Sequence, residues 1–146
     1  MQAYLGIGTN IGDKRANIER CLKLLGQYAG DIVRQSQIME SAPWGFESKN
    51  IFLNMVVCIE TGLSPFQLLE TTQRTEQEMG RREKSTDGIY HDRIIDIDIL
   101  LYEDYHITSP TLTIPHPHIL ERDFVRCPLQ EILPSNHFFM RKLLQE

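Results

Sequence analysis

The alternation of apolar and polar positions along the chain predicts a succession of strands and helices. In residues 2–8 the side chains of Ala3, Leu5 and Ile7 fall on one face, as in a strand with one buried side. Further segments repeat this strand pattern or carry apolar residues at helical spacing. In chain order the predicted elements are a strand over 2–8, a helix over 13–29, a weaker strand over 31–40, a strong strand over 51–60, a helix over 64–79 and a strand over 94–102.

The order of these elements, βαββαβ, is that of the ferredoxin-like arrangement. We therefore expect an α+β protein with a ferredoxin-like βαββαβ core, in which the helices pack on an antiparallel sheet. The proline-rich remainder predicts turns with an extra C-terminal strand and helices, including a helix near 124–132. Because the chain has no repeat, low-complexity stretch or linker-like composition, we expect a single domain over residues 1–146.

The composition is that of an ordinary globular protein, with 41% hydrophobic and 24% charged residues. The three cysteines lie far apart and form no Cys-x-x-Cys pair, which indicates a reducing compartment rather than a disulfide framework or a zinc site. The first residues do not resemble a signal peptide, and no apolar run approaches the roughly 20 residues of a membrane helix. We expect a cytoplasmic protein with no membrane partner.

The formal net charge of −5 argues against a nucleic-acid partner, because nucleic-acid-binding domains are usually basic. The same charge would repel a phosphate substrate, so local clusters of basic residues must attract one. Such a cluster, Arg81, Arg82 and Lys84, follows the second predicted helix, in which Gln73 and Glu76 share a face. The cluster is either a solvated helix end or a phosphate clamp.

The clearest chemical feature is a pair of aspartates in the strand over 94–102. Asp96 and Asp98 share one face, about 6.5 Å apart along the strand, and isoleucines bracket them. Carboxylates among apolar residues are costly unless they are neutralised, and Mg²⁺ prefers such oxygen ligands, completed by water and substrate phosphates. Arg93 stands directly before the pair. The pattern favours a metal site over the alternative, an edge strand with a solvated acidic face.

A glycine-rich turn over 6–12 follows the first strand. Its third glycine comes one residue late for the dinucleotide-binding G-x-G-x-x-G pattern, and the turn lacks the spacing of a P-loop. The glycines either form a tight turn that caps the following helix, or leave room for a ligand to approach the strand end.

Aromatic residues and an amide indicate a site for a flat heterocycle. Phe52 and Asn54 share a strand face, Trp44 lies in the preceding turn, and Phe124 lies far downstream. Aromatic rings stack on a flat ligand, and an amide supplies both a donor and an acceptor. The alternative is that both phenylalanines are ordinary core residues.

The segment Pro115-His116-Pro117-His118 carries two histidines close together, with Arg122 following. The flanking prolines and the lack of a cysteine partner argue against zinc. A contact to phosphate or a surface turn is favoured instead.

Taken together, these residues resemble the hydroxymethyldihydropterin pyrophosphokinase family over about residues 2–133. The most specific segments are Arg-x-x-Asp-x-Asp-Ile at 93–99 and Pro-His at 115–116, with Arg122 and Phe124 following. Further matches in family order and spacing are Gly-Thr-Asn at 8–10, Pro-Trp-Gly at 43–45 and Phe-Leu-Asn at 52–54.

The resemblance implies transfer of a diphosphate from ATP to 6-hydroxymethyl-7,8-dihydropterin, giving AMP and the pterin diphosphate, in folate biosynthesis. It implies two Mg²⁺ ions held by Asp96 and Asp98, ATP as co-substrate, and a protein that acts on small molecules as a monomer. The expected catalytic residues are Arg82, Arg93, Asp96 and Asp98. The residues expected to bind ATP are Gln73, Glu76, Lys84, Arg93, Thr113, His116 and Arg122. The residues expected to bind the pterin are Gly8, Thr9, Ser41, Pro43, Trp44, Phe52, Asn54, Tyr90, Asp96 and Phe124, with Phe52 and Phe124 on the two sides of its ring.

The chain departs from the family pattern at Ile89, Thr111 and Pro117, which leaves the ATP contacts at these positions open. The charged segment over 82–92 lacks periodicity and is expected to close over bound ATP. Two other functions compete: a non-catalytic ferredoxin-like module that binds a metabolite or RNA, and an enzyme that uses Mg-ATP on another small alcohol.

Overall fold

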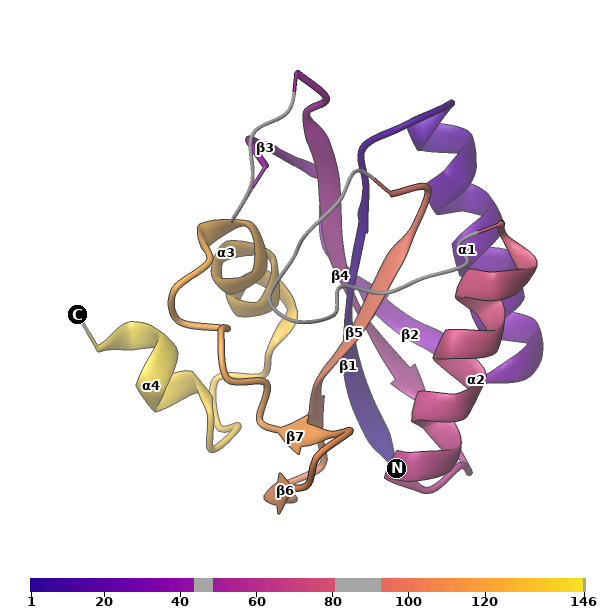
Figure 1. Cartoon of the computed structure of the whole chain (residues 1–146). Helices are drawn as coiled ribbons and strands as arrows, with labels where there is room; N and C mark the ends of the chain where they lie inside the picture. Colours follow the sequence, from indigo (N-terminus) through magenta and orange to yellow (C-terminus); the bar gives the residue numbers. More distant parts are fainter. Residues whose placement is uncertain (44–48, 81–92, 146) are drawn as a thin grey trace.

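The computed structural model describes residues 1–43, 49–80 and 93–145, and it contains strands and helices in the predicted order (Figure 1). The elements are β1 (Gln2–Thr9), α1 (Lys14–Tyr28), β2 (Asp31–Gln35), β3 (Met39–Ser41), β4 (Phe52–Glu60), α2 (Pro65–Glu78), β5 (Asp96–Tyr102), β6 (Ile107–Thr108), β7 (Thr113–Ile114), α3 (Asp123–Ile132) and α4 (Met140–Leu144).

The main sheet has the strand order β2-β4-β1-β5, and β3 also pairs with β4. Every neighbouring pair is antiparallel. The central pair runs without interruption from Gln2 opposite Glu60 to Thr9 opposite Leu53. The predicted antiparallel sheet with helices packed on it is confirmed, and a separate two-stranded sheet of β6 and β7 follows it.

The strand predicted over 31–40 is divided into β2 and β3, and the reason lies at Ser36. The Ser36 amide donates to the carbonyl of Val56, but the Val56 amide donates to the Ser36 hydroxyl, at 2.9 Å in both cases. A side-chain oxygen thus replaces a backbone carbonyl in the ladder, so regular pairing stops there and resumes at Met39 opposite Asn54.

Local sequence signals set the helix ends. The Asp13 carboxylate caps α1 by accepting from the Ala16 amide, at 3.1 Å. The predicted capping box of α2 is confirmed, because Ser64 and Gln67 each bind the other's backbone amide. Among the helices of the described residues, none combines the length and the apolar character needed to cross a membrane.

Each face of the main sheet packs against a different pair of helices. Helices α1 and α2 lie on one side of the sheet, and α3 and α4 lie on the other (Figure 1). Ala3, Leu5 and Ile7 belong to the core under α1 and α2, whereas Tyr4 belongs to the core under α3 and α4. The alternation predicted for β1 therefore separates two cores.

Candidate active site

Three neighbouring strands bring the predicted amide and carboxylates to one face of the sheet. In the register of β1, Gly8 lies opposite Asn54 of β4 on one side and opposite Asp96 of β5 on the other. Gly6 lies opposite Asp98. Because alternate residues of a strand share a face, these side chains lie on the α3 side, beyond the part of that face that forms the core. We call Asn54, Gly8 and Asp96 the site row.

The missing side chain at Gly8 leaves room in the middle of the site row. A Cβ atom at Gly8 would lie 3.1 Å from Oδ1 of Asn54 and 3.6 Å from Cδ1 of Phe52. The first distance is shorter than most Cβ contacts in proteins, so the lack of a side chain at Gly8 allows Asn54 and Phe52 to lie close over β1. The glycine thus places the Asn54 amide oxygen directly beside the end of β1.

Arg93 connects the carboxylates to the aromatic residue across this gap. Its Nη1 lies 3.4 Å from Oδ2 of Asp96, and its guanidinium carbon lies 5.4 Å from the centre of the Phe52 ring. The side chains of Arg93 and Asp96 are only 10% and 20% exposed. Because little solvent surrounds this ion pair, its attraction is screened less than that of a surface pair. Through its contacts with Asp96 and Phe52, Arg93 sets both the charge and the shape of the site.

The Asn54 amide is fixed by its neighbours. Its Nδ2 donates to Oγ of Ser41 at 2.7 Å and to the carbonyl of Met39 at 3.4 Å, and the residue is 5% exposed. With the nitrogen used in this way, the oxygen Oδ1 is the atom that faces the space over Gly8. The predicted pterin residues Ser41 and Asn54 are thus brought together.

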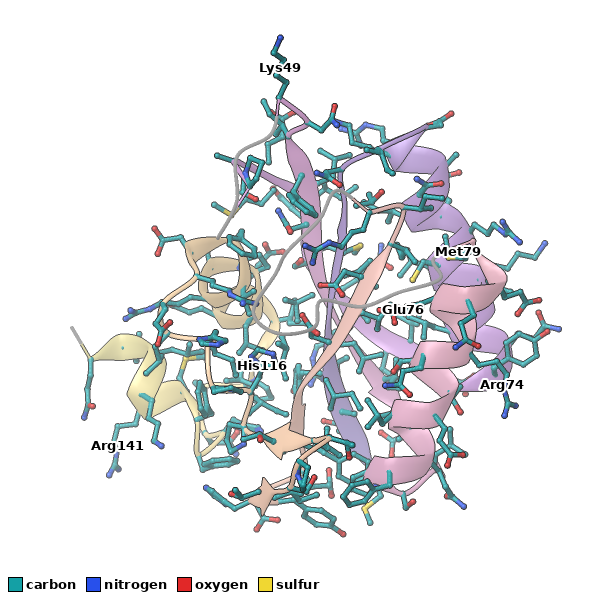
Figure 2. All side chains as sticks on the ribbon, viewed as in Figure 1. Lys49, Arg74, Glu76, Met79, His116 and Arg141 are labelled. Atoms are coloured by element: carbon teal, nitrogen blue, oxygen red, sulfur yellow. The ribbon has the colours of Figure 1, made fainter. Side chains whose placement is uncertain are left out.

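His116 lies beside β5, on the side of the carboxylates (Figure 2). Its amide donates to the carbonyl of Leu100 at 2.9 Å, and its Nδ1 accepts from the amide of His118 at 3.2 Å. Burial lowers the pKa of His116, against the opposing influence of Asp98. The imidazole is therefore neutral near pH 7 with its proton on Nε2, which makes it a hydrogen-bond donor.

Two further predicted residues lie at the start of α3. The guanidinium carbon of Arg122 lies 5.9 Å from the centre of the Phe124 ring. Both predicted pterin-stacking phenylalanines, Phe52 and Phe124, therefore have an arginine against the ring, a contact that favours a cation over an aromatic face. Both arginines had been predicted to act near the phosphates.

Two predicted residues do not share this face. Figure 2 shows Glu76 projecting from α2 toward β5, where its Oε2 accepts from the Ile97 amide at 2.7 Å and the residue is 2% exposed. Thr9 is fully buried, and its hydroxyl accepts from Nδ2 of Asn17 in α1 at 3.2 Å. In the structure Glu76 binds the edge of β5 from the α2 side, and the hydroxyl of Thr9 is turned to α1.

The remaining predicted residues are more scattered. Gln73 is exposed on α2, Thr113 is half-buried in β7, and Pro43 is half-buried after β3. Four other predicted residues lie outside the described residues, namely Trp44, Arg82, Lys84 and Tyr90. The segment over 82–92, which is expected to close over ATP, also lies outside them.

The donor set fits a magnesium ion that is completed by a substrate. Within residues 1–43, 49–80 and 93–145, no three histidine, cysteine, aspartate or glutamate side chains are grouped to hold a metal. Asp96 and Asp98 are half-buried on one face, opposite Gly8 and Gly6 in the register. Magnesium is typically held by one or two carboxylates together with waters and phosphates, so two carboxylates suffice.

Sequence reasoning missed Asn10, which is 1% exposed and whose Oδ1 accepts from the Arg93 amide at 2.7 Å. Its position in the Gly-Thr-Asn turn was the only signal in the sequence.

The described residues also line a hollow of about 380 Å³ at the opposite end of β1, formed by Gln2, Tyr4, Glu103, Asp104, His137 and Phe138. It contains none of the predicted site residues, so the chemistry is assigned to the site row.

Comparison with known proteins finds a matching family model and similar relatives. A model of the 7,8-dihydro-6-hydroxymethylpterin-pyrophosphokinase family matches residues 4–134. The 2-amino-4-hydroxy-6-hydroxymethyldihydropteridine pyrophosphokinase of Porphyromonas gingivalis is 45% identical over 135 residues, which are 92% of each chain. The protein of the same name from Bacillus subtilis is 43% identical over 131 residues, 89% of this chain and 77% of that one.

Solved structures share the fold. A Plasmodium falciparum HPPK-DHPS structure superimposes with a TM-score of 0.77 at 18% identity, covering 97% of this chain. This chain spans only 44% of that longer one, so the likeness concerns the fold alone. The family resemblance predicted from the motifs is confirmed by the sequence matches: the chain belongs to the 7,8-dihydro-6-hydroxymethylpterin-pyrophosphokinase family.

Proposed function

We propose that this protein transfers a diphosphate from ATP to 6-hydroxymethyl-7,8-dihydropterin, giving AMP and the pterin diphosphate, as a step of folate biosynthesis. Membership of the family supports this reaction. The structural observation that carries it is the site row, in which an amide and a carboxylate lie on one sheet face with no side chain between them. We also assign the core to the ferredoxin-like class, which the strand order β2-β4-β1-β5 supports.

The pterin binds over Gly8, between the start of β4 and the start of α3. Oδ1 of Asn54 accepts a hydrogen bond from the heterocycle, while Ser41 holds the amide in orientation. Phe52 and Phe124 provide aromatic surface on the two sides of the ring. Pro43 and Trp44 complete the pocket from the neighbouring turn.

The phosphates of ATP bind on the β5 side of the site row. Arg93 and Arg122 supply positive charge, and the neutral His116 donates from Nε2 to a phosphate oxygen. Asp96 and Asp98 hold Mg²⁺, which when bound neutralises phosphate charge and polarises the transferring group as a Lewis acid. Gln73, Glu76, Lys84 and Thr113 contribute to the nucleotide side, and Glu76 does so by fixing Ile97 and hence the strand between the two aspartates.

The reaction needs positioning and charge stabilisation from the protein. The hydroxymethyl oxygen of the pterin attacks the β-phosphorus of ATP, the bond from that phosphorus to the oxygen bridging the α-phosphorus breaks, and AMP leaves. The two substrates meet across Gly8, because the amide lies on β4 and the carboxylates lie on β5. Arg93 contacts both sides of this junction and is placed to stabilise the charge that develops there.

We further propose that the protein acts as a monomer in the cytoplasm. Its three cysteines are free thiols, two of them buried, as suits a reducing compartment.

The deciding experiment incubates the protein with Mg-ATP and 6-hydroxymethyl-7,8-dihydropterin and identifies the nucleotide product. AMP that forms only when the pterin is present supports the proposal. ADP as the product would indicate a simple kinase, and no turnover would indicate a binding module. A thermal shift with ATP, measured with and without Mg²⁺, separates the last case, because a module without a metal site gains nothing from the ion.

A further inference from the structure

Side chains of the turn between β1 and α1, and of the first turn of α1, contact the backbone of two segments that are distant in the sequence. Nδ2 of Asn10 donates to the carbonyl of Asn50 at 3.3 Å, and Nζ of Lys14 donates to the carbonyl of Ile51 at 2.9 Å. On the other side, Nδ2 of Asn17 donates to the carbonyl of Ile94 at 3.4 Å. The first segment leads into β4, and the second leads into β5. These side chains therefore contact the chain directly before β4 and directly before β5, the two strands that carry the two halves of the site.

Asn10 makes the closest of these contacts, and it makes them to Arg93. The Arg93 amide donates to Oδ1 of Asn10 at 2.7 Å, and the Asn10 amide donates to the Arg93 carbonyl at 3.1 Å. Both backbone hydrogen-bonding groups of Arg93 are thereby bound to one residue. These bonds extend the contact between β1 and β5 beyond the last paired residues, Gly8 and Asp96, to the residue whose side chain crosses the site.

The same side chain also holds the β4 side. Asn50 lies two residues before Phe52, the residue against whose ring the Arg93 guanidinium lies. The oxygen of the Asn10 amide thus binds the Arg93 backbone, while its nitrogen binds the Asn50 backbone. At 1% exposure, no solvent competes for these bonds.

We propose that Asn10 is a positioning residue that fixes Arg93 against Phe52 and so couples the pterin half of the site to the ATP half. The inference rests on the proposed function, because it assigns the two halves to those substrates. Asn10 itself is not placed against either substrate: it acts through the backbone positions of Arg93 and Asn50. Its oxygen sets the position of Arg93, and its nitrogen ties that position to β4.

Two substitutions separate the two contacts. Asn10→Ala removes both side-chain hydrogen bonds. Asn10→Asp keeps an oxygen acceptor for the Arg93 amide but has no hydrogen to donate to Asn50. Asn17→Ala is the matched control: it loosens the same turn, including its contact to Ile94, but leaves both Asn10 contacts in place.

We expect Asn10→Ala to lower kcat by at least about tenfold while the KM for ATP changes by less than about threefold, the pattern of a group that matters in the transition state. Asn10→Asp should restore most of kcat. In both variants a non-reactive ATP analogue should lose most of its ability to tighten pterin binding. Calorimetry measures this ability as the ratio of the pterin Kd without the analogue to the pterin Kd with it. Asn17→Ala should keep both kcat and this ratio.

Hydrogen exchange of the Arg93 amide gives a readout that does not need activity. We expect faster exchange in Asn10→Ala and near wild-type protection in Asn10→Asp and Asn17→Ala. Unchanged exchange in Asn10→Ala, or an equal loss of kcat in Asn17→Ala, would overturn the inference. If Asn10→Ala does not fold, the Asn10→Asp variant alone tests the inference. If the ATP analogue tightens pterin binding to Asn10→Asp as much as to the wild type, the role of Asn10 is contradicted. A wild-type protein that forms no AMP would reject the proposed function, and the exchange measurement would still test whether Asn10 positions Arg93.

Discussion

Two rows of residues cross the same three strands one position apart, and their chemistry is opposite. Met55, Ile7 and Ile97 lie opposite one another across β4, β1 and β5, and they are 2%, 2% and 1% exposed in the core under α1 and α2. The next row is the site row of Asn54, Gly8 and Asp96. We call the first the core row. One face of these three strands therefore packs in the core at this level, and the other face carries the residues that are available for chemistry.

The site face itself also has two halves. Toward the start of β1, Tyr4 and its neighbours across the sheet, Cys58 and Leu101, fill the surface under α3 and α4. At Gly6 the Leu100 side chain still covers the strand, and only toward Gly8 do the polar side chains of Asn54 and Asp96 flank it. A register shift between β1 and β5 at Tyr4 and Leu5 separates the halves, and it places both Leu100 and Leu101 in the filled half. A bulge thus allows a full core and an open site on one strand.

The largest expected effect comes from removing a carboxylate of the site face. Asp98→Ala or Asp96→Ala should lower kcat/KM by at least about 100-fold, because a lost metal ligand removes several kcal/mol of transition-state stabilisation. For Asp98→Ala the free energy of unfolding should stay within about 1 kcal/mol of wild type, since a half-buried carboxylate contributes little to packing. Steady-state kinetics and urea unfolding measure the two quantities.

Asp104→Ala is the control, because this exposed residue lies in the turn after β5 and away from the site row. Near wild-type turnover in either site variant at saturating Mg²⁺ would show that the carboxylates do not hold the metal.

The core row should show the reverse behaviour. Ile7→Ala should reduce the free energy of unfolding by about 2–5 kcal/mol, because it leaves a cavity between β1 and the helices α1 and α2. The kcat of the folded fraction should change little, since the side chain points away from Gly8. Denaturant unfolding together with kinetics at low temperature tests this. A loss of kcat as large as that of Asp98→Ala would mean that the two faces are not independent.

Asn54→Ala should weaken pterin binding by about 1–3 kcal/mol, the cost of a lost hydrogen bond in a closed pocket. ATP affinity should stay nearly constant, because the carboxylates and Arg93 lie on the other side of Gly8. Calorimetry with each ligand separately measures the difference. An equal loss for both ligands would contradict the assignment of β4 to the pterin.

The smallest effects come from two glycines with opposite surroundings. Gly8→Ala should weaken pterin binding by about 1 kcal/mol, since its new Cβ would crowd Oδ1 of Asn54, which Ser41 and Met39 hold in place. Gly26 lies in the exposed face of α1, and a Cβ there meets nothing within 4 Å. Gly26→Ala should therefore raise the free energy of unfolding by about 0.5–1 kcal/mol without changing binding.

Calorimetry measures the pterin affinity of both variants, and thermal unfolding measures their stability. Together they distinguish a glycine at which a side chain does not fit from a glycine that alanine can replace. A Gly8→Ala protein with unchanged pterin affinity would show that the ligand does not approach β1 at this point.

Local sequence patterns predict the elements, their order and the faces of their residues. Alternation in β1 assigned Ile7 to a core, the capping box started α2, and the spacing of Asp96 and Asp98 placed both carboxylates on one face. These features depend on neighbours a few residues away, which is why local pattern suffices. The family motifs then predicted the activity class.

The lateral neighbours of each strand depend on how the whole chain packs. The tertiary structure placed Gly8 between Asn54 and Asp96, turned Glu76 to the Ile97 amide, interrupted the strand predicted over 31–40 at Ser36, and set Asn10 against Arg93. Each of these contacts joins residues between 20 and 88 positions apart in the chain or depends on a pairing that does. Periodicity reports which way a side chain points, but the lateral order of strands follows from how the whole sheet and its helices pack, and no local pattern contains it.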